Sequence, residues 1–358
     1  ALDVLGVGSG DEVIVPGFMW ISSISAIIRA RAIPVLVDSD QTLGVDPEDL
    51  KVKISERTKV IMVVPMLGGS SKIGEIMEVV RNVNNSRKKN NLSKIFVLED
   101  CAQSLGAHAF GIPGSSQTSL PEGYYKLGTF GDIGTFSLQL NKDITAGEGG
   151  MVVTRDKELN DRVDALHNAG YIKKEKNNIN WYGDIPYGWG HGRRMSELQG
   201  AVARVQLKKL DSILDNIRKN HSFFEEFFKK QGIKLRKRAY QNNPGDTGYY
   251  LCFHLPENLD DNTAISKGRE IAKDLKDKGF NVWFLHDFEV HIYYNIEPLV
   301  KKFPMNDGSP WEDPKNSFHT QYKYDRGALP NLDHLLIRTI GLNACLLYTS
   351  PSPRDRIA

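Results

Sequence analysis

The sequence predicts an α/β fold: a mostly parallel sheet flanked by helices, followed by a smaller C-terminal α+β domain. Two observations lead to this prediction. In the first 150 residues, short β-branched runs alternate with segments of helical patterning, as in strands joined by crossover helices. The centre of each run is continuously apolar, with charged residues only at the ends, which is typical of parallel strands that helices cover on both faces.

The first part of the chain is expected to contain four strands and three helices. Parallel sheets bind ligands at the carboxyl ends of their strands. Asp100 ends the last of the four predicted strands, so we expect it at a ligand-binding edge. The predicted strands are residues 12–16, 34–38, 59–64 and 94–100, and the predicted helices are residues 20–31, 46–54 and 72–83.

The pattern changes in the second part of the chain. One long helix is expected at residues 195–230, with a break near Asn220. Ser196 and Gln199 have the spacing of a capping box, whether they lie at its start or inside it. A strand at 248–254, a helix at 263–278 and a strand at 281–285 are predicted to follow.

We place the domain boundary near Asp211, inside or just after the long helix. Residues 1–211 are predicted to form a large domain and residues 212–344 a small one. Residues 345–358 match one reading frame of a sequencing-library adapter, which predicts a non-native tail; a natural Pro/Ser-rich tail is the alternative. Because the chain also starts without methionine, we expect truncation at both ends. Two polar stretches, 82–93 and 111–123, are predicted surface insertions.

Composition narrows the classes of partner. The 46 basic and 44 acidic residues give a net charge of +2, so neither nucleic acid nor an anionic membrane is expected to bind. No apolar run approaches the ~20 residues that span a bilayer. The three cysteines are far apart and form no metal-ligand spacing, which predicts a reducing, cytoplasmic location and no metal site.

Two segments carry residues suited to catalysis. A carboxylate such as Asp100, held at a strand end, can keep a pyridine nitrogen protonated. Lys142 lies among glycine, hydroxyl and apolar residues, and burial there would lower its pKa toward the neutral amine that attacks an aldehyde. The Ser137 hydroxyl and nearby glycine amides are suited to binding a phosphate. A lysine alone is usually solvated, so only the surrounding sequence pattern can indicate whether Lys142 is catalytic.

That pattern resembles one family. Four features are similar in order and spacing to the DegT/DnrJ/EryC1/StrS family. They are Glu-Asp100-Cys-Ala-Gln103, then Gly131-Asp-Ile-Gly-Thr-Phe-Ser137, Lys142 and Gly147-Glu-Gly-Gly150. Members of this family are fold-type-I transaminases that use pyridoxal 5'-phosphate and act on sugars or aminocyclitols. Further matches are Gly10-Asp-Glu-Val-Ile-Val-Pro16, Arg194-Met-Ser-Glu-Leu-Gln199 and Arg326-Gly-Ala-Leu-Pro330.

The resemblance implies roles for five residues. Lys142 would form the Schiff base with the cofactor, Asp100 would pair with the pyridine nitrogen, and Gln103 would lie beside the ring. Ser137 would bind the phosphate, and Trp20 would stack on the ring, unless it is an ordinary core aromatic. The implied reaction moves an amino group from glutamate or glutamine to a keto or aldehyde sugar, nucleotide sugar or cyclitol, and the implied assembly is a homodimer.

The sequence departs from the family pattern at two places. The chain begins after the turn that helps to bind the phosphate in family members. Gly192 stands where many members have an asparagine that reaches the partner subunit's cofactor, and His191 or Arg193 either compensates or lies on the surface. Residues 291–295 either line the substrate pocket or pack in the core.

Three other functions are alternatives to the aminotransferase. Sugar dehydratases of the same family have histidine in place of the lysine, so Lys142 argues against that activity. A non-catalytic relative that binds a sugar or a partner protein is the second alternative. A nicotinamide dehydrogenase would need a glycine-rich loop after a strand, whereas Gly6-Val-Gly8-Ser-Gly10 precedes the first one.

Overall fold

The computed structural model of the chain describes residues 1–114, 120–171, 188–240 and 245–344. The predicted tail at 345–358 and the central part of the predicted insertion at 111–123 lie outside these residues.

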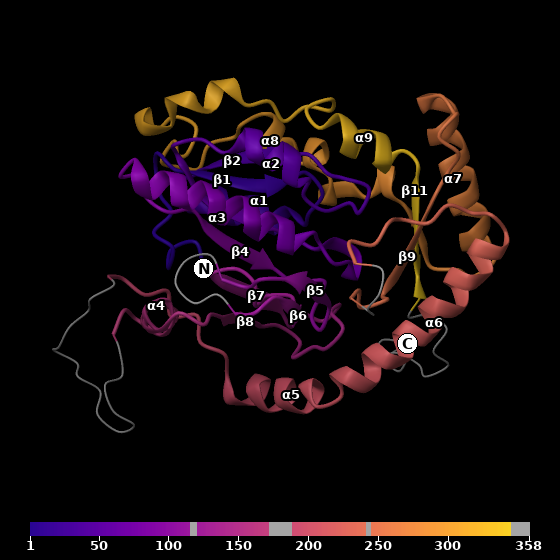
Figure 1. The fold of residues 1–358 in the computed structure, drawn as a ribbon, viewed down its shortest axis with the longest axis horizontal. Helices are drawn as coiled ribbons and strands as arrows, with labels where there is room; N and C mark the ends of the chain where they lie inside the picture. The colour runs from indigo at the N-terminus through magenta and orange to yellow at the C-terminus, as the bar shows by residue number, and fades with distance from the viewer. Residues whose placement is uncertain (115–119, 172–187, 241–244, 345–358) are drawn as a thin grey trace.

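A six-stranded sheet forms the centre of the molecule (Figure 1). Its strand order is β2-β1-β3-β4-β7-β8. The first five strands in that order are parallel, and β8 pairs antiparallel with β7. The mostly parallel sheet is therefore confirmed. The strands are β1 Glu12–Pro16, β2 Ile33–Val37, β3 Thr58–Val63, β4 Phe96–Asp100, β7 Ile133–Ser137 and β8 Gly150–Val153.

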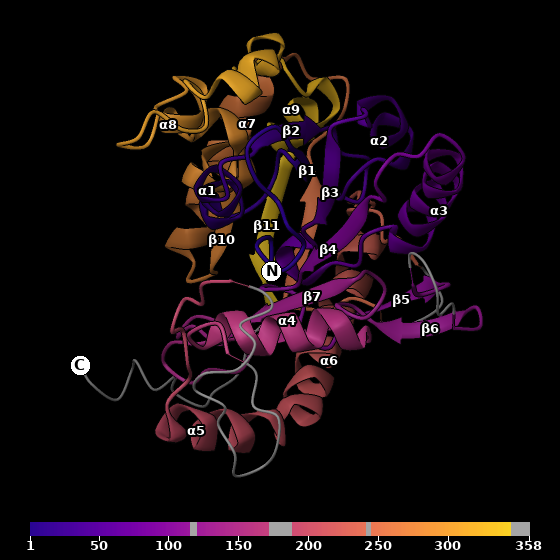
Figure 2. The same ribbon diagram turned by 90° about the vertical axis from the view of Figure 1, so that its left-hand side faces the viewer.

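Helices cover both faces of this sheet (Figure 2). All five residues of β1 are buried, and successive side chains point to opposite faces. Val13 and Val15 therefore join one apolar core while Ile14 joins the other. The first core includes side chains of α1 Ile21–Arg29 and α4 Lys157–His167, and the second includes those of α2 Pro47–Lys53 and α3 Ile73–Lys89.

A separate three-stranded antiparallel sheet forms in the C-terminal part, with the order β10-β11-β9. The helix α7 Asp261–Asp277 packs against it. The segment after β10 returns to the first core, where Tyr293, Leu329 and Leu332 are buried. The division into domains near Asp211 stays a prediction. The remaining elements of this part are β9 Tyr250–His254, β10 Val282–Phe284, β11 Thr339–Asn343, α8 Glu297–Val300 and α9 Pro330–Leu336.

The long helix predicted at 195–230 is two helices, α5 Glu197–Leu207 and α6 Leu210–Lys230. The break lies at Lys208 and Lys209, so the prediction of a break near Asn220 was wrong. The packing accounts for the position: α6 begins with Leu210, which is buried with Leu138 and Ile144, whereas no residue of α5 is buried. Figure 1 shows α6 leaving the axis of α5 toward the small sheet. Ser196 caps α5, with the capping box complete.

The stretch 82–93 is mostly helix rather than an inserted loop, because α3 continues to Lys89. Arg87 explains this extension. Its guanidinium is buried and donates hydrogen bonds to the backbone oxygens of Ser93, Ser55 and Glu56. On either side of the second predicted insertion, β5 His108–Gly111 and β6 Gly123–Lys126 pair as an antiparallel hairpin.

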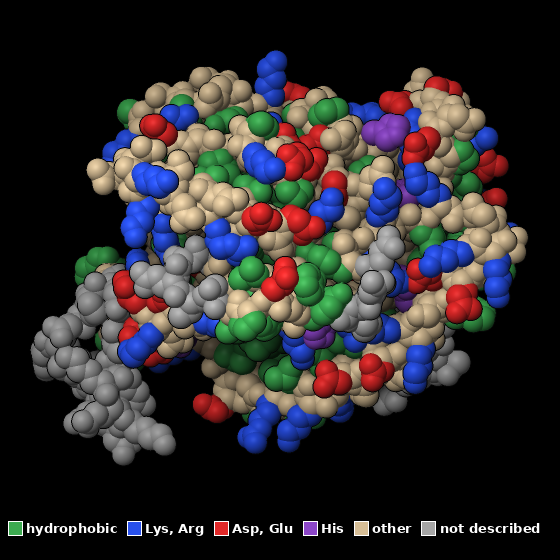
Figure 3. Space-filling view, in the orientation of Figure 1, with side chains coloured by type: hydrophobic (Ala, Val, Ile, Leu, Met, Phe, Trp, Pro, Cys, Tyr) green, Lys and Arg blue, Asp and Glu red, His purple; other side chains and the backbone are tan. Residues whose placement is uncertain are grey.

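The surface in Figure 3 carries acidic and basic side chains interspersed across that face. Within the described ranges, no helix combines the length and the apolar character that crossing a bilayer requires.

Candidate active site

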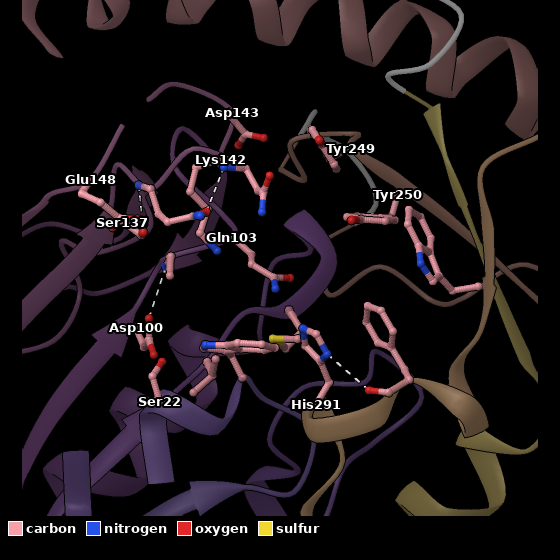
Figure 4. Close-up of a pocket in the computed structure, with 18 residues that line it drawn as sticks. Ser22, Asp100, Gln103, Ser137, Lys142, Asp143, Glu148, Tyr249, Tyr250 and His291 are labelled. Carbon is pink, nitrogen blue, oxygen red and sulfur yellow. Dashed lines mark hydrogen bonds between the residues drawn. The ribbon is translucent and has the colours of Figure 1, made fainter. Parts of the chain in front are cut away.

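One cavity of about 570 Å³ lies where the carboxyl ends of β4 and β7 meet α1. All five predicted site residues line it, although they come from separate parts of the chain: Trp20, Asp100, Gln103, Ser137 and Lys142. Figure 4 shows Asp100, Gln103, Ser137 and Lys142 around one space, with Tyr249, Tyr250 and His291 also facing it. The fold brings them together because parallel strands end at the same edge of the sheet.

Asp100 is the last residue of β4. Its Oδ2 accepts a hydrogen bond from Ser23 Oγ at 2.8 Å, and its Oδ1 accepts one from the backbone N of Ala102 at 3.3 Å. Burial raises the pKa of Asp100, while these two hydrogen bonds and the positive charge of Lys142 oppose the rise. The carboxyl is thus held in one orientation beside the cavity.

Lys142 lies in the loop between β7 and β8. The loop folds on itself, with Lys142 N bonded to Gln139 O and Leu138 N bonded to Gly149 O. The buried side chains of Leu138 and Ile144 anchor it. Burial lowers the pKa of Lys142, and the charges of Asp100 and Asp143 oppose the shift. Burial also raises the pKa of Asp143, to about 7.

Ser137 and Gln103 are both held by backbone groups. Ser137, the last residue of β7, accepts a hydrogen bond on Oγ from the N of Gln139 at 3.3 Å, so its own hydroxyl hydrogen is free to donate elsewhere. Gln103 Oε1 accepts a hydrogen bond from the N of Leu67 at 3.0 Å. Both side chains lie at strand ends beside the cavity.

Trp20 immediately precedes α1, and 45% of it is exposed. The alternative that it is a core aromatic is therefore wrong. Its ring packs against His291, with 4.7 Å between the ring centroids. His291 stacks in turn on Phe288 at 4.0 Å. Burial lowers the pKa of His291 to about 4, with a further lowering by the charge of Lys142, so this imidazole is neutral at pH 7.

In the segment 291–295, one residue lines the cavity and another packs in the core. His291 lines the cavity. Tyr293 is fully buried, and its hydroxyl donates to Asp333 at 3.0 Å. The pocket interpretation thus holds for His291 and the packing interpretation for Tyr293.

Several lining residues were not singled out from the sequence. Asp143 and Glu148 come from the same loop as Lys142, so their nearness to it could have indicated them. Tyr249, Tyr250 and Trp283 come from the small sheet and the turn before it, and no local pattern links these three to the large sheet.

A second cavity of about 430 Å³ adjoins the first, and Ser22 and Asp100 line both. His191 and Arg193, the residues beside Gly192, line the second cavity and are exposed. The ring nitrogen Nε2 of His191 is 2.6 Å from Asp3 Oδ2. Both residues therefore lie at the protein surface.

Comparison with known proteins identifies the family to which the chain belongs. The pattern of the DegT/DnrJ/EryC1/StrS aminotransferase family matches residues 1–303. The chain belongs to this family. The resemblance seen in the sequence is therefore confirmed, and aminotransferase is the activity for which the family is named.

Similar proteins include two curated enzymes. The L-glutamine:2-deoxy-scyllo-inosose aminotransferase of Streptomyces lividus is 31% identical over 72% of this chain and 56% of its own length. The GDP-perosamine synthase of Escherichia coli O157:H7 is 38% identical over 61% of this chain and 52% of its own length. The chain thus spans about half the length of the curated relatives that it matches.

Solved structures confirm the fold class. A sugar aminotransferase from Micromonospora echinospora superposes with a TM-score of 0.70 at 22% identity, covering 99% of this chain and 81% of that one. At this level of identity the likeness establishes the fold-type-I architecture.

Proposed function

We propose that the protein is a pyridoxal-phosphate-dependent aminotransferase that moves an amino group from glutamate or glutamine to a sugar-like carbonyl compound. One observation carries the proposal: Lys142, Asp100, Gln103, Ser137 and Trp20 line a single cavity. The relatives' names support the substrate class, since one pairs glutamine with a cyclitol ketone and the other is a GDP-sugar enzyme. Free sugars, nucleotide sugars and cyclitols all belong to this class.

The lining residues fit the cofactor. Its aldehyde needs an uncharged amine, and burial lowers the pKa of Lys142 in that direction. Its ring nitrogen needs a carboxylate, which Asp100 supplies in the same cavity. Its phosphate needs donors, and Ser137 keeps its hydroxyl hydrogen available. Trp20 offers an exposed ring face, and Gln103 lies beside the same space.

Each side chain has a separate task in the proposed reaction. The cofactor, when bound, supplies an electron sink for the electron pair left when a C–H bond of the substrate breaks. Lys142 Nζ, in its neutral form, removes the proton from the carbon that carries the donor's amino group and returns a proton to the acceptor carbon. Asp100 holds the proton on the ring nitrogen. His291, neutral at pH 7, places no positive charge against Lys142.

Reductive trapping tests the assignment of Lys142. The purified chain is mixed with pyridoxal phosphate, reduced with borohydride and digested, and the modified peptide is identified by mass spectrometry. We expect the pyridoxyl group on Lys142 and none after Lys142→Ala. Lys267→Ala, at an exposed position of α7, is the matched control and should be labelled like the wild type. Labelling that survives Lys142→Ala would contradict the assignment.

Amino transfer is measured separately, with isotope-labelled glutamine or glutamate and a panel of keto sugars, nucleotide sugars and cyclitol ketones. Transfer of the label to any of these supports the proposed activity. Loss of a substrate hydroxyl without transfer would indicate the dehydratase instead. Binding of the sugar with neither reaction would indicate the non-catalytic relative.

We also propose that the protein is a homodimer, with α5 at the interface. Its apolar side chains are exposed, Leu198 by 82%, with Val202 and Val205 on the same helix, and an exposed apolar stripe commonly marks an interface. The helix adjoins the cavity, because Gln199 Nε2 donates to the backbone oxygen of Glu148 at 2.9 Å. A cytoplasmic location stays a prediction.

Sedimentation tests the dimer. Leu198→Glu combined with Val202→Glu should give a monomer and weaken binding of pyridoxal phosphate. Val52→Glu, at an exposed valine of α2, should change neither property. A wild-type chain that sediments as a monomer at every concentration tested would contradict the proposal.

A further inference from the structure

Ser23 is a buried hydroxyl residue on α1 that lines the second cavity. Only 3% of it is exposed, and its Oγ donates to Asp100 Oδ2 at 2.8 Å. Buried hydroxyls cost free energy unless they are paired, and this one is paired with a carboxyl group that lines the cavity. The contact joins residues 77 positions apart in the chain, so no local sequence pattern predicts it.

The position of Asp100 makes this contact consequential. Asp100 lines both the cavity of about 570 Å³ and the neighbouring cavity of about 430 Å³, and Ser23 lines the second of them. Two donors hold the group where it is, Ser23 Oγ on one oxygen and Ala102 N on the other. Of the two bonds, the one from Ser23 is shorter by 0.5 Å.

The helix gives Ser23 little freedom to move. Ile24 and Ile27 are buried in the first core, and Ser23 N donates to the backbone oxygen of Trp20 at 3.0 Å. Trp20 and Ser23 are one helical turn apart, so they lie on the same side of α1. One helix therefore places both the aromatic ring that lines the cavity and the hydroxyl that holds the carboxyl group.

We propose that Ser23 is a positioning residue, whose hydroxyl keeps the Asp100 carboxylate charged and aimed at the ring nitrogen of pyridoxal phosphate. This inference rests on the proposed function. Burial favours the neutral form of Asp100, and the Ser23 hydrogen bond is the largest influence against it. Without the hydroxyl, the carboxyl group gains a proton more easily and loses the shorter of the two hydrogen bonds that fix its orientation.

The test compares two ligands that differ only at the ring nitrogen: pyridoxal phosphate and its 1-deaza analogue, which has carbon in that place. Affinities are measured by absorbance titration. Ser23→Ala should weaken binding of pyridoxal phosphate by about tenfold, because hydrogen bonds to charged groups have that magnitude. It should leave the affinity for the deaza analogue unchanged, because that ring offers Asp100 nothing to pair with.

Two further variants keep the outcome clear. Ser23→Thr retains the hydroxyl and should restore the affinity for pyridoxal phosphate. Ser25→Ala, on the exposed side of the same helix, should behave like the wild type. Equal weakening for both ligands would overturn the role of Ser23, since a general disturbance of α1 acts on both. A wild type that binds no pyridoxal phosphate would overturn the proposed function, and the role of Ser23 with it.

Discussion

The side chain of Gln103 bridges the carboxyl ends of two neighbouring strands, because its Oε1 accepts a hydrogen bond from the backbone N of Leu67 at 3.0 Å. Leu67 follows β3 and Gln103 follows β4. Leu67 has a φ of 58°, in the left-handed region that non-glycine residues seldom adopt. The hydrogen bond therefore stabilises a strained turn at the edge of the cavity.

Gln103→Leu should remove this support. The Leu67 N–H would lose its partner in a partly buried place, at a cost of about 1–2 kcal/mol in the free energy of unfolding. Denaturant titration measures the loss, and pyridoxal phosphate should also bind more weakly. Gln103→Glu keeps an acceptor for Leu67 and should lose less stability; an equal loss in the two variants would contradict this explanation.

The buried pair of Arg236 and Asp246 attaches the small sheet to the same edge. Arg236 Nη2 lies 2.7 Å from Asp246 Oδ2, and Asp246 Oδ1 accepts from the N and Oγ of Ser70. Arg236→Met would leave the carboxylate buried without its partner, so we expect a loss of about 3 kcal/mol in the free energy of unfolding.

An exposed pair provides the control for that measurement. Lys273→Met breaks the pair with Asp277 on the surface of α7 and should leave the free energy of unfolding almost unchanged, because water screens an exposed ion pair. If both variants unfold at the same denaturant concentration, burial does not decide the strength of the Arg236 pair.

Glu99 organises the segment that leads into β7. Its fully buried carboxylate accepts hydrogen bonds from the backbone N of Gly128, Phe130 and Gly131, at 2.7, 2.7 and 2.8 Å. Burial raises the pKa of Glu99, and these three donors oppose the rise. Glu99→Ala should cost about 3 kcal/mol, because buried N–H groups lose their acceptor. Calorimetry that finds an unchanged melting temperature would contradict this role.

Asp143 should make stability depend on pH. Burial raises its pKa from the ordinary 3.8 to about 7, so the folded state holds its proton more tightly than the unfolded state does. Proton binding by Asp143 therefore stabilises the fold fully at a pH below 3.8, the pKa in the unfolded state. This contribution is lost as the pH rises from there to about 7, the pKa in the folded state. Asp143→Asn should raise the melting temperature by several degrees at about pH 8 and change it little at about pH 4. A difference that is the same at both pH values would contradict this assignment.

Much of the large sheet could be predicted from local pattern. The strand predicted at 12–16 is β1, and the next three agree with β2, β3 and β4 within two residues at each end. Continuous apolar runs identify strands buried on both faces. The strands β7 and β8 were not predicted. Only two of the five residues of β7 and none of the four residues of β8 are buried, so neither strand has a continuous apolar run.

Part of the candidate site could also be predicted, because some of its residues belong to recognisable local patterns. Asp100, Gln103, Ser137 and Lys142 belong to segments whose order and spacing identify the family. Ser23, Tyr249 and Trp283 carry no such pattern, since each reaches the site through packing of an element from elsewhere in the chain. The position of the helix break was likewise decided by contacts of Leu210 with Leu138 and Ile144.

The sequence by itself determined the fold class, the family and the five residues on which the proposed chemistry depends, because these follow from runs and spacings within short segments. Only the tertiary structure decided what surrounds those residues. It made Asp100 part of the lining of two cavities, gave it Ser23 as a donor, and left Lys142 half-buried beside Asp143. Burial and hydrogen bonding arise from residues distant in the chain, and they set the charge of each group.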